Sequence, residues 1–283
     1  MCAEISAKAV KELRDRTGVG MGKCKDALVQ AGGDIEEAIS ILRKSGMAQA
    51  VKKEGRETKE GMIKTAQNNK TLGLIEINAE TDFVVKNDKF QEFAEDLANE
   101  ICLTCPLTVE EFLGQKYSKD SKLTIDELRA ITMQSLGENL RIRRIELFPI
   151  KDEFSLGVYS HAGGKLVTLV EIEGSSSEQE LAREIAMHCA AEAPEYLSPS
   201  EIPERVIEHE KEIARAQVAG KPPQVIEKII EGKLNAYYQQ VCLLLQNYVK
   251  DTSITVSQLV KNRSKEIGKE LKISQFLRWN VGG

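Results

Sequence analysis

Two stretches of the chain decide its architecture: FAEDLANEICLTCP at residues 93–106 and LAREIAMHCAAEAP at residues 181–194. Each places apolar residues three and four positions apart, which is typical of one face of an α-helix, and each ends in a proline that stops the helix. The second stretch begins 88 positions after the first. An internal repeat of this kind predicts the fold more firmly than local propensities do.

The repeat continues beyond this helix with a different offset. Five residues recur 131 positions later in the same order: Thr124, Leu128, Gly137, Leu140 and Ile142 are matched by Thr255, Leu259, Gly268, Leu271 and Ile273. Each copy also opens with an expected β-hairpin, at residues 62–78 with a turn at Asn68-Asn69, and at residues 156–173 with a turn at Gly163-Gly164. We therefore predict an α+β fold with two related subdomains, each a small antiparallel sheet covered by helices.

The two copies differ in two places. Between the hairpin and the first helix, the first copy is seven residues longer than the second, and the second copy carries 43 extra residues before Thr255. That insert predicts an antiparallel hairpin of helices at 204–218 and 224–245, joined by a turn at 219–223 that contains Pro222-Pro223. Its second helix is apolar enough either to pack within the hairpin or to contact a protein partner or a second copy; the apolar residues are Val225, Ile226, Ile229, Ile230, Leu234, Tyr237, Tyr238 and Val241.

The first 46 residues predict three short helices. The third begins with the capping-box spacing of Asp34 and Glu37 and is expected to end at Ser45-Gly46, before a charged, partly helical linker over 47–60. The predicted domains are residues 1–54 for the helical domain and the start of the linker, 55–147 for the first core subdomain, 148–199 with 247–283 for the second, and 200–246 for the helical hairpin.

Composition narrows the possible functions. The chain has 283 residues, a net charge of -5 and 41% hydrophobic residues, so it lacks the basic excess that binding to a phosphate backbone needs. The sequence has no apolar run that could span a bilayer and no secretory leader pattern, so we expect a cytoplasmic protein with its six cysteines reduced. Cys102 and Cys105 form a CxxC inside a helical pattern, without a second CxxC or a nearby histidine, so no metal or redox cofactor is expected.

Catalytic motifs are missing as well. His161, His188 and His209 fall in different predicted elements, and no nucleophile or metalloprotease motif occurs. The segment 18–23, GVGMGK, differs from a phosphate-binding loop in its glycine spacing, in the cysteine that follows the lysine, and in the helix that precedes it. We therefore expect no catalytic residues and no cofactor, and we predict that the protein is not an enzyme.

The extra residues of the first copy include Thr81-Asp82-Phe83-Val84. Phe83 has two interpretations: it folds back onto the subdomain core while Asn87 or Asp88 caps the next helix, or it is an exposed anchor for a partner. The residue pattern alone leaves both open.

Several motifs in order resemble the elongation factor Ts family, over essentially the whole chain. The segment 81–86, TDFVVK, is similar to the TDFVAK signature of that family. The other matching segments are 10–14 with 17–21 and 24–25, 33–34 with 43–46, 137–139 with 143–144, 185–188, and 220–222.

This resemblance implies a protein that binds the GTPase elongation factor Tu and makes it release GDP without a chemical step of its own. Phe83 would insert near the Mg²⁺ and phosphate site of the GTPase, Asp82 would stabilise the displaced arrangement, and Thr81 and Val84 would shape the loop. The N-terminal helices would form a ubiquitin-associated-like domain that docks on the GTPase, where contacts are expected from the residues Val10 and Met21; for Val10, core packing is the alternative.

The resemblance also implies a partner contact by His161 in the second subdomain, and a coiled coil in the helical hairpin that some members use for self-association. Many members continue after the final strand with a further helical module that touches the GTPase, so a contact of that kind is in question for this sequence. Two other functions stay open: a ribosome- or RNA-associated scaffold, and a redox or hydrolytic enzyme that uses Cys102 and Cys105.

Overall fold

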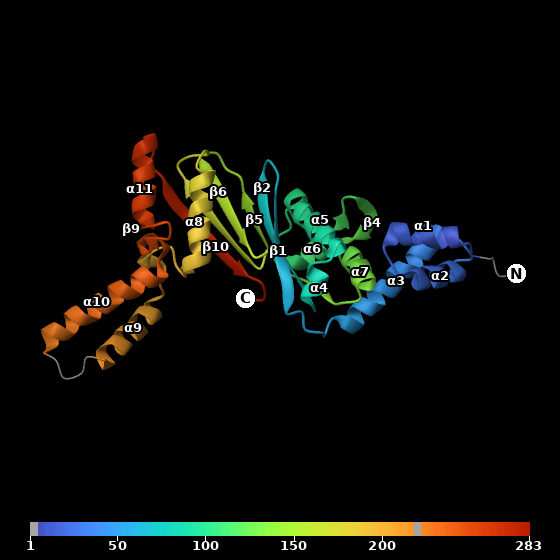
Figure 1. The fold of residues 1–283 in the computed structure, drawn as a ribbon, viewed down its shortest axis with the longest axis horizontal. Coiled ribbons are helices and arrows are strands. Elements are labelled where there is room, and N and C mark those ends of the chain that lie inside the picture. The colour runs from blue at the N-terminus through green and yellow to red at the C-terminus, as the bar shows by residue number, and fades with distance from the viewer. Residues whose placement is uncertain (1–4, 218–221) are drawn as a thin grey trace. The chain divides into compact units, whose positions relative to one another are not determined.

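Two three-stranded sheets organise the chain in the computed structural model, which describes residues 5–217 and 222–283 (Figure 1). Each sheet belongs to its own compact unit. The first unit holds the described residues up to Pro149 together with Asn280–Gly283, and the second holds Ile150–Trp279. The α+β fold class is thereby confirmed.

Three helices begin the first unit: α1 (Ala7–Thr17), α2 (Met21–Gln30) and α3 (Ile35–Lys53). The side chain of Ser6 caps the start of α1, and Asp34 caps α3 by accepting a hydrogen bond from the Glu37 N–H at 2.9 Å. Gly18 ends α1 in the left-handed conformation, at φ 66°, so GVGMGK is a helix end followed by a helix start. The apolar faces of the three helices form a small core of their own around Leu13, Cys24 and Leu28.

Helix α3 is longer than the sequence predicts. It does not end at Ser45-Gly46 but continues to Lys53. Gly46 lies against the backbone of Ala130 in α7 (Ile125–Leu136), where a Cβ atom would be 3.5 Å from the carbonyl oxygen. A Cβ atom at that distance would make only an ordinary van der Waals contact, so the close approach does not require glycine. The packing of α3 on α7 instead offsets the low helix propensity of Gly46 and lets the helix continue.

The first core sheet has the order β1-β2-β5, formed by β1 (Glu60–Gln67), β2 (Thr71–Ala79) and β5 (Leu140–Pro149), and both pairings are antiparallel. The hairpin turns where predicted, because the Asn68 carboxamide oxygen accepts hydrogen bonds from the N–H groups of Lys70 and Thr71, each at 2.8 Å. The remaining elements of this subdomain are α4 (Asp82–Val85), α5 (Asp88–Thr104), α6 (Val109–Gly114), β3 (Lys116–Tyr117) and β4 (Asp120–Thr124).

A fully buried carboxylate lies in the central strand of this sheet. Glu76 accepts hydrogen bonds from Arg144 at 2.7 Å and from the backbone N–H of Gly282 at 2.8 Å. Arg144 also donates to the carbonyl oxygen of Asn280 at 2.8 Å. These bonds compensate the cost of burying the charge and hold the residues after β10 against the first sheet.

The second unit repeats this plan. Its sheet has the order β10-β7-β6 and is formed by β6 (Phe154–His161), β7 (Leu166–Glu173) and β10 (Lys272–Asn280). The predicted turn at Gly163-Gly164 joins β6 to β7. The other elements are α8 (Gln179–Glu192), β8 (Asn247–Tyr248), β9 (Asp251–Thr255), α11 (Val256–Ile267) and the 3-10 turns Pro199–Glu201 and Leu243–Leu245.

The repeat extends to individual hydrogen bonds. Tyr117 donates its hydroxyl to Asp96 of α5 at 2.7 Å, and Tyr248 donates to Glu184 of α8 at 3.1 Å. Each helix also ends in a residue with positive φ, Cys105 at 50° and Ala193 at 47°. The tyrosines keep the offset of 131 and the helix residues the offset of 88, so the internal repeat inferred from the sequence is present in the structure.

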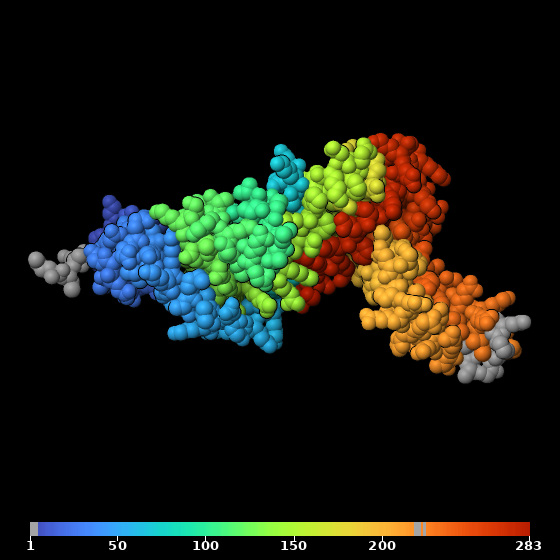
Figure 2. All heavy atoms as spheres, turned by 180° about the vertical axis from the view of Figure 1, so that it is seen from behind, coloured from blue at the N-terminus to red at the C-terminus, as the bar shows by residue number. Residues whose placement is uncertain are grey.

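Helices α9 (Glu204–Ala216) and α10 (Pro223–Val241) pack against each other and extend away from the sheet of their own unit, as Figures 1 and 2 show in orange. Of the predicted turn at 219–223, residues 219–221 lie outside the described residues. Helix α10 ends at Val241, earlier than the sequence suggests, because the carbonyl of Val241 accepts hydrogen bonds from the N–H groups of Glu195 and Tyr196. Among the described helices, none combines the length and apolar character of a bilayer-spanning segment.

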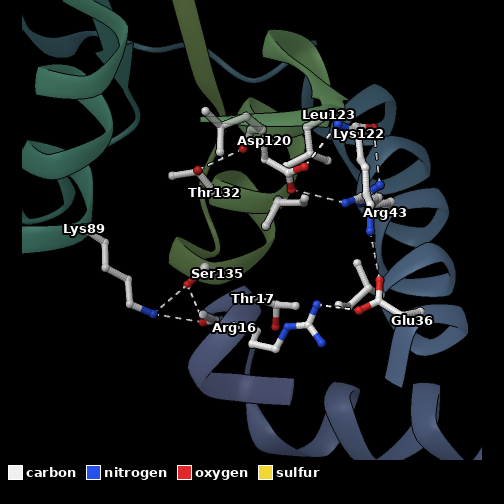
Figure 3. A pocket seen from close by; sticks show the side chains of 14 residues that line it. Arg16, Thr17, Glu36, Arg43, Lys89, Asp120, Lys122, Leu123, Thr132 and Ser135 are labelled. Atoms are coloured by element: carbon white, nitrogen blue, oxygen red, sulfur yellow. Dashed lines mark hydrogen bonds and ion pairs between the residues drawn. The ribbon is translucent and has the colours of Figure 1, made fainter. Parts of the chain in front are cut away.

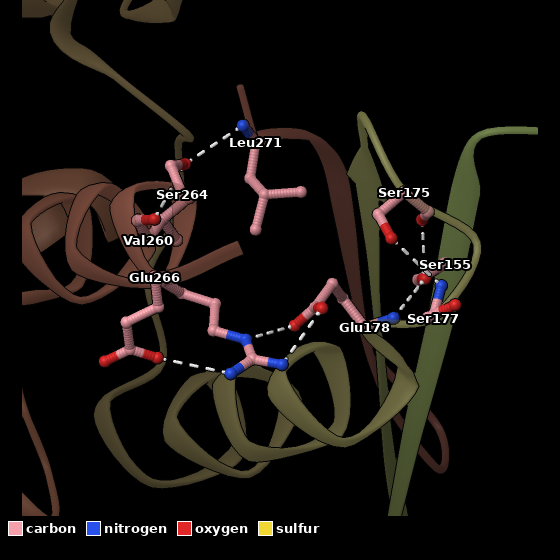
Figure 4. Close-up of polar contacts among 9 residues, drawn as sticks. Ser155, Ser175, Ser177, Glu178, Val260, Ser264, Glu266 and Leu271 are labelled. Atoms are coloured by element: carbon pink, nitrogen blue, oxygen red, sulfur yellow. Dashed lines mark hydrogen bonds and ion pairs between the residues drawn. The ribbon is translucent and has the colours of Figure 1, made fainter. Parts of the chain in front are cut away.

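The second copy connects its hairpin to its helix by a short, tightly held segment (Figure 4). The Ser155 hydroxyl donates to the Ser175 carbonyl at 2.7 Å and accepts from the Glu178 N–H at 2.8 Å. The Glu178 carboxylate, in turn, accepts two hydrogen bonds from the Arg263 guanidinium, at 2.7 and 3.2 Å. The fold therefore closes this connection without the extra residues that the first copy carries.

The burial of His188 predicts that the second unit is sensitive to acid. The imidazole is fully buried: Nδ1 accepts the N–H of Val249 at 3.2 Å, so Nε2 carries the proton and donates to Gln246 at 3.0 Å. Burial lowers the pKa of His188 in the folded protein, whereas the pKa in the unfolded chain is about 6.5. Below pH of about 6.5 the unfolded state therefore binds more protons, and the free energy of unfolding falls as the pH falls.

We expect urea unfolding, followed from pH 7.5 to 5, to show this loss with a slope of at most about 1.4 kcal/mol per pH unit for the one proton. The variant His188→Gln should flatten the slope, while the control His209→Gln, on the exposed face of α9, should keep it. An unchanged slope in His188→Gln would assign the acid sensitivity to other groups.

Candidate functional site

The extra residues of the first copy lie between β2 and α5. Among them, Thr81 precedes the four-residue helix α4, and we refer to Thr81–Val84 as the TDFV loop. The side chain of Phe83 is 81% exposed, whereas Val85, two residues later, is buried in the core. A single turn of helix therefore directs one apolar side chain inward and a larger one into solvent.

This exposure excludes the folded-back position of Phe83. It does not fold back onto the core, because Val84 and Val85 take the positions that face it. The other part of that interpretation is correct, since the Asn87 side chain caps α5 by accepting the N–H of Lys89 at 3.0 Å. Phe83 is thus an exposed aromatic side chain on a loop with well-defined ends.

Thr81 fixes the loop through three hydrogen bonds. Its hydroxyl accepts the N–H of Val84 at 3.4 Å, which caps α4. The same hydroxyl donates to one carboxylate oxygen of Glu138 at 2.6 Å, and the Thr81 N–H donates to the other oxygen at 3.0 Å. Because Glu138 follows α7, the base of the TDFV loop is fastened to a second element.

Asp82 occupies the first position of α4, next to Phe83. Its carboxylate pairs with Lys86 one turn later, at 2.7 Å, and this contact raises the pKa of the Lys86 amine. Both side chains reach solvent, and an exposed pair of this kind adds little stability. The pair with Lys86 therefore does little to hold the Asp82 carboxylate in place.

The two N-terminal candidates differ in exposure. Met21 begins α2 and is 50% exposed, so its side chain is available for contact. Val10 is only 6% exposed and packs in the helical core with Leu13 and Leu28. The packing supports the core alternative for Val10, and we do not place it on the contact surface.

The N-terminal helices are fastened to the first core subdomain around a cleft of about 480 Å³ (Figure 3). At one side, the carbonyl of Gly18 accepts hydrogen bonds from Lys89 at 2.9 Å and from Ser135 at 2.7 Å. At the other, Arg43 of α3 pairs with Asp120 of β4 at 3.5 Å. Met21 and the TDFV loop thus belong to one connected unit.

His161 lies at the end of β6 in the second unit. Its ring is exposed and stacks on that of Tyr159, and its Nδ1 is 3.3 Å from the Tyr159 hydroxyl. The pair forms a small polar and aromatic surface at the hairpin tip.

The cysteine pair does not resemble a reactive site. Cys102 is buried in α5 and donates to the carbonyl of Ala66 at 3.2 Å, while Cys105 is exposed at the helix end. Burial raises the pKa of the Cys102 thiol, which disfavours the nucleophilic thiolate. This argues against the redox or hydrolytic alternative.

Glu138, Glu80 and Lys53 were not among the sequence candidates, yet they surround the base of the TDFV loop. Glu80 accepts the N–H of Asn139 at 2.7 Å, and Lys53 donates to the carbonyl of Gly137 at 2.6 Å. The signal for Glu138 was present in the segment 137–139, which resembles a family motif, but its contact spans 57 positions and no local pattern predicts it.

Comparison with known proteins shows the family of the chain. The family model described as Elongation factor TS matches residues 80–283. Over 280 residues, the chain is 57% identical to the elongation factor Ts of Protochlamydia amoebophila strain UWE25, 45% to that of Chlamydia pneumoniae and 43% to that of Chlamydia felis, with 99% of both sequences covered in each case. Since similarity at this level runs from end to end, the chain belongs to the elongation factor Ts family.

Proposed function

We propose that this protein binds elongation factor Tu in its GDP-bound state and promotes the release of GDP, so that GTP can replace it. The support comes chiefly from Phe83, an aromatic side chain 81% exposed on a loop that is clamped at its base. Exposing an aromatic ring forfeits hydrophobic free energy, and aromatic side chains, phenylalanine included, are enriched in the buried cores of protein interfaces.

In the proposed mechanism, Phe83 inserts as a wedge near the phosphates of the bound nucleotide and the Mg²⁺ ion that bridges them in a GTPase. Asp82 stabilises the displaced arrangement, and its surface pair with Lys86 does little to hold its carboxylate in place. Met21 adds an apolar contact from the N-terminal helices, and His161 a contact from the second unit.

This mechanism changes no covalent bond, so the protein is not a catalyst of a chemical reaction. Its energetics are reciprocal: if the protein weakens GDP binding by a given factor, GDP weakens binding of the protein by the same factor. Incoming nucleotide then displaces the protein, which can act again. We place this activity in the cytoplasm, and we assign self-association to α9 and α10, where Ile213 and Val225 are 40% and 42% exposed.

The direct test is the rate at which a fluorescent GDP analogue leaves purified elongation factor Tu in stopped flow. Substoichiometric amounts of this protein should accelerate release repeatedly and by roughly tenfold or more, the size expected when a typical coupling of about 1–3 kcal/mol between two sites acts mainly on the dissociation rate of GDP. Bovine serum albumin at the same concentration serves as the control. If release is not accelerated at any concentration, the proposed function is wrong.

A further inference from the structure

On the basis of this function, we propose that Glu138 and Glu80 are positioning residues that hold Phe83 in its outward orientation before the partner binds. Glu80 follows β2 and Glu138 follows α7, and the two segments hydrogen-bond to each other. Glu138 binds the backbone and hydroxyl of Thr81, at 3.0 and 2.6 Å, and Glu80 binds the N–H of Asn139 at 2.7 Å. Each glutamate thus accepts the N–H of the residue next to the other glutamate. We call this reciprocal pair of contacts, Glu138 with Thr81 and Glu80 with Asn139, the clamp.

Helix α4 needs this clamp because it is too short to be stable alone. It has four residues, and the first turn of a helix fixes several dihedral angles for a single hydrogen bond. The Thr81 hydroxyl directs its hydrogen to Glu138, which leaves an oxygen lone pair for the N–H of Val84. Glu138 therefore orients the cap that begins the turn on which Phe83 lies.

The internal repeat supplies a natural comparison. At the offset of 131, Lys269 and Glu270 occupy the positions of Glu138 and Asn139. Lys269 lies 3.4 Å from Glu153 and forms an ion pair with it. The second copy lacks the longer loop and closes its connection through Ser155 and Glu178 instead. Of the two copies, the one that carries the TDFV loop carries the clamp, which indicates that the clamp serves the loop and not the shared fold.

The clamp is also tied to the end of α3. Asn139 donates its side-chain amide to the carbonyl of Arg56 at 3.0 Å, and Arg56 pairs with Glu80 at 3.4 Å. Lys53 donates to the carbonyl of Gly137 at 2.6 Å. Residues from three separate segments therefore meet at the base of the loop, and this convergence limits its motion.

A preorganised loop lowers the apparent dissociation constant, because only molecules with the loop in the competent orientation bind. We expect Glu138→Ala to raise the concentration of this protein that gives half-maximal GDP release by about tenfold, as a fall of the competent fraction to roughly a tenth would do. The maximal rate should change less, since Phe83 itself is still present. The control Glu146→Ala removes an exposed carboxylate of the same unit on β5.

Hydrogen exchange of the free protein tests the clamp without any partner. In Glu138→Ala the amide of Val84 should lose protection while the amides of β2 keep theirs. Thr81→Val, which removes the hydroxyl with little change of shape, should act like Glu138→Ala, and Thr81→Ser should act like the wild type. If Glu138→Ala loses protection at Val84 but the wild-type protein does not accelerate GDP release, the clamp is supported and the proposed function is refuted.

Two results would overturn the positioning role. One is an unchanged half-maximal concentration in both Glu138→Ala and Thr81→Val. The other is a lowered unfolding temperature with exchange activity and Val84 protection intact, which would make Glu138 a structural residue only. If Glu138→Ala does not fold, the comparison of Thr81→Val with Thr81→Ser decides the question.

Discussion

Replacing Phe83 with alanine is expected to slow the stimulated release of GDP by roughly thirtyfold or more, the kinetic equivalent of the ~2 kcal/mol that defines an interface hot spot. The ring is the largest exposed apolar group of the TDFV loop, and alanine leaves no wedge to insert. Because the side chain is 81% exposed, its removal costs the folded protein little, and the unfolding temperature should stay within a degree or two of the wild type.

The matched control for this variant is Leu107→Ala. Leu107 is 89% exposed in the same unit, after the far end of α5, so the substitution also removes exposed apolar surface. We expect stopped-flow measurements with fluorescent GDP to give wild-type rates for Leu107→Ala and strongly reduced rates for Phe83→Ala. Equal stimulation by both variants would show that nucleotide release does not depend on the Phe83 ring.

The second large effect is expected for stability, at Gly157 in β6. A Cβ atom there would lie 2.1 Å from the backbone nitrogen of Arg183 and 2.2 Å from the carbonyl carbon of Ala182, both in α8. Neither atom can move without the helix. The variant Gly157→Ala should therefore push α8 away from the sheet and lower the free energy of unfolding by about 3 kcal/mol or more, at the upper end for overpacked positions.

Urea unfolding at neutral pH measures this effect, with Gly232→Ala as the control. Gly232 lies within α10, and a Cβ atom there meets nothing within 4 Å. Alanine should stabilise that helix by about 0.5–1 kcal/mol, since glycine is a poor helix former. Opposite signs for the two glycines are the expected result; a neutral Gly157→Ala would mean that α8 packs less closely on β6 than described.

Much of the architecture could be predicted from the sequence, because the internal repeat gives two independent indications of each structural element. The hairpin turns at Asn68 and Gly163, the proline-ended helices and the α+β class were all predicted from it and are present. The extension of α3 through Gly46 was not predicted, because the helix is stabilised there by packing on α7, about Ala130, 84 positions away, which no local pattern reveals.

The candidate site was predicted in part. The residue pattern located the TDFV loop, but it could not determine the direction of Phe83, which depends on Val84 and Val85 occupying the core-facing positions of a single turn. The burial of Val10 likewise depends on how three helices meet. The contribution of Glu138 could be found only in the tertiary structure. Its partner Thr81 follows β2, whereas Glu138 itself precedes β5, 57 positions later in the sequence.

The buried Glu76 has a consequence for how this chain matures during its own synthesis. Gly282, which donates to Glu76, is added 206 residues after it. While a ribosome is still making the second unit, the nascent first sheet has Arg144 in place to balance the charge but lacks this donor. Residues that emerge after the second unit therefore complete the first unit, so the first unit cannot finish folding before the second has been synthesised.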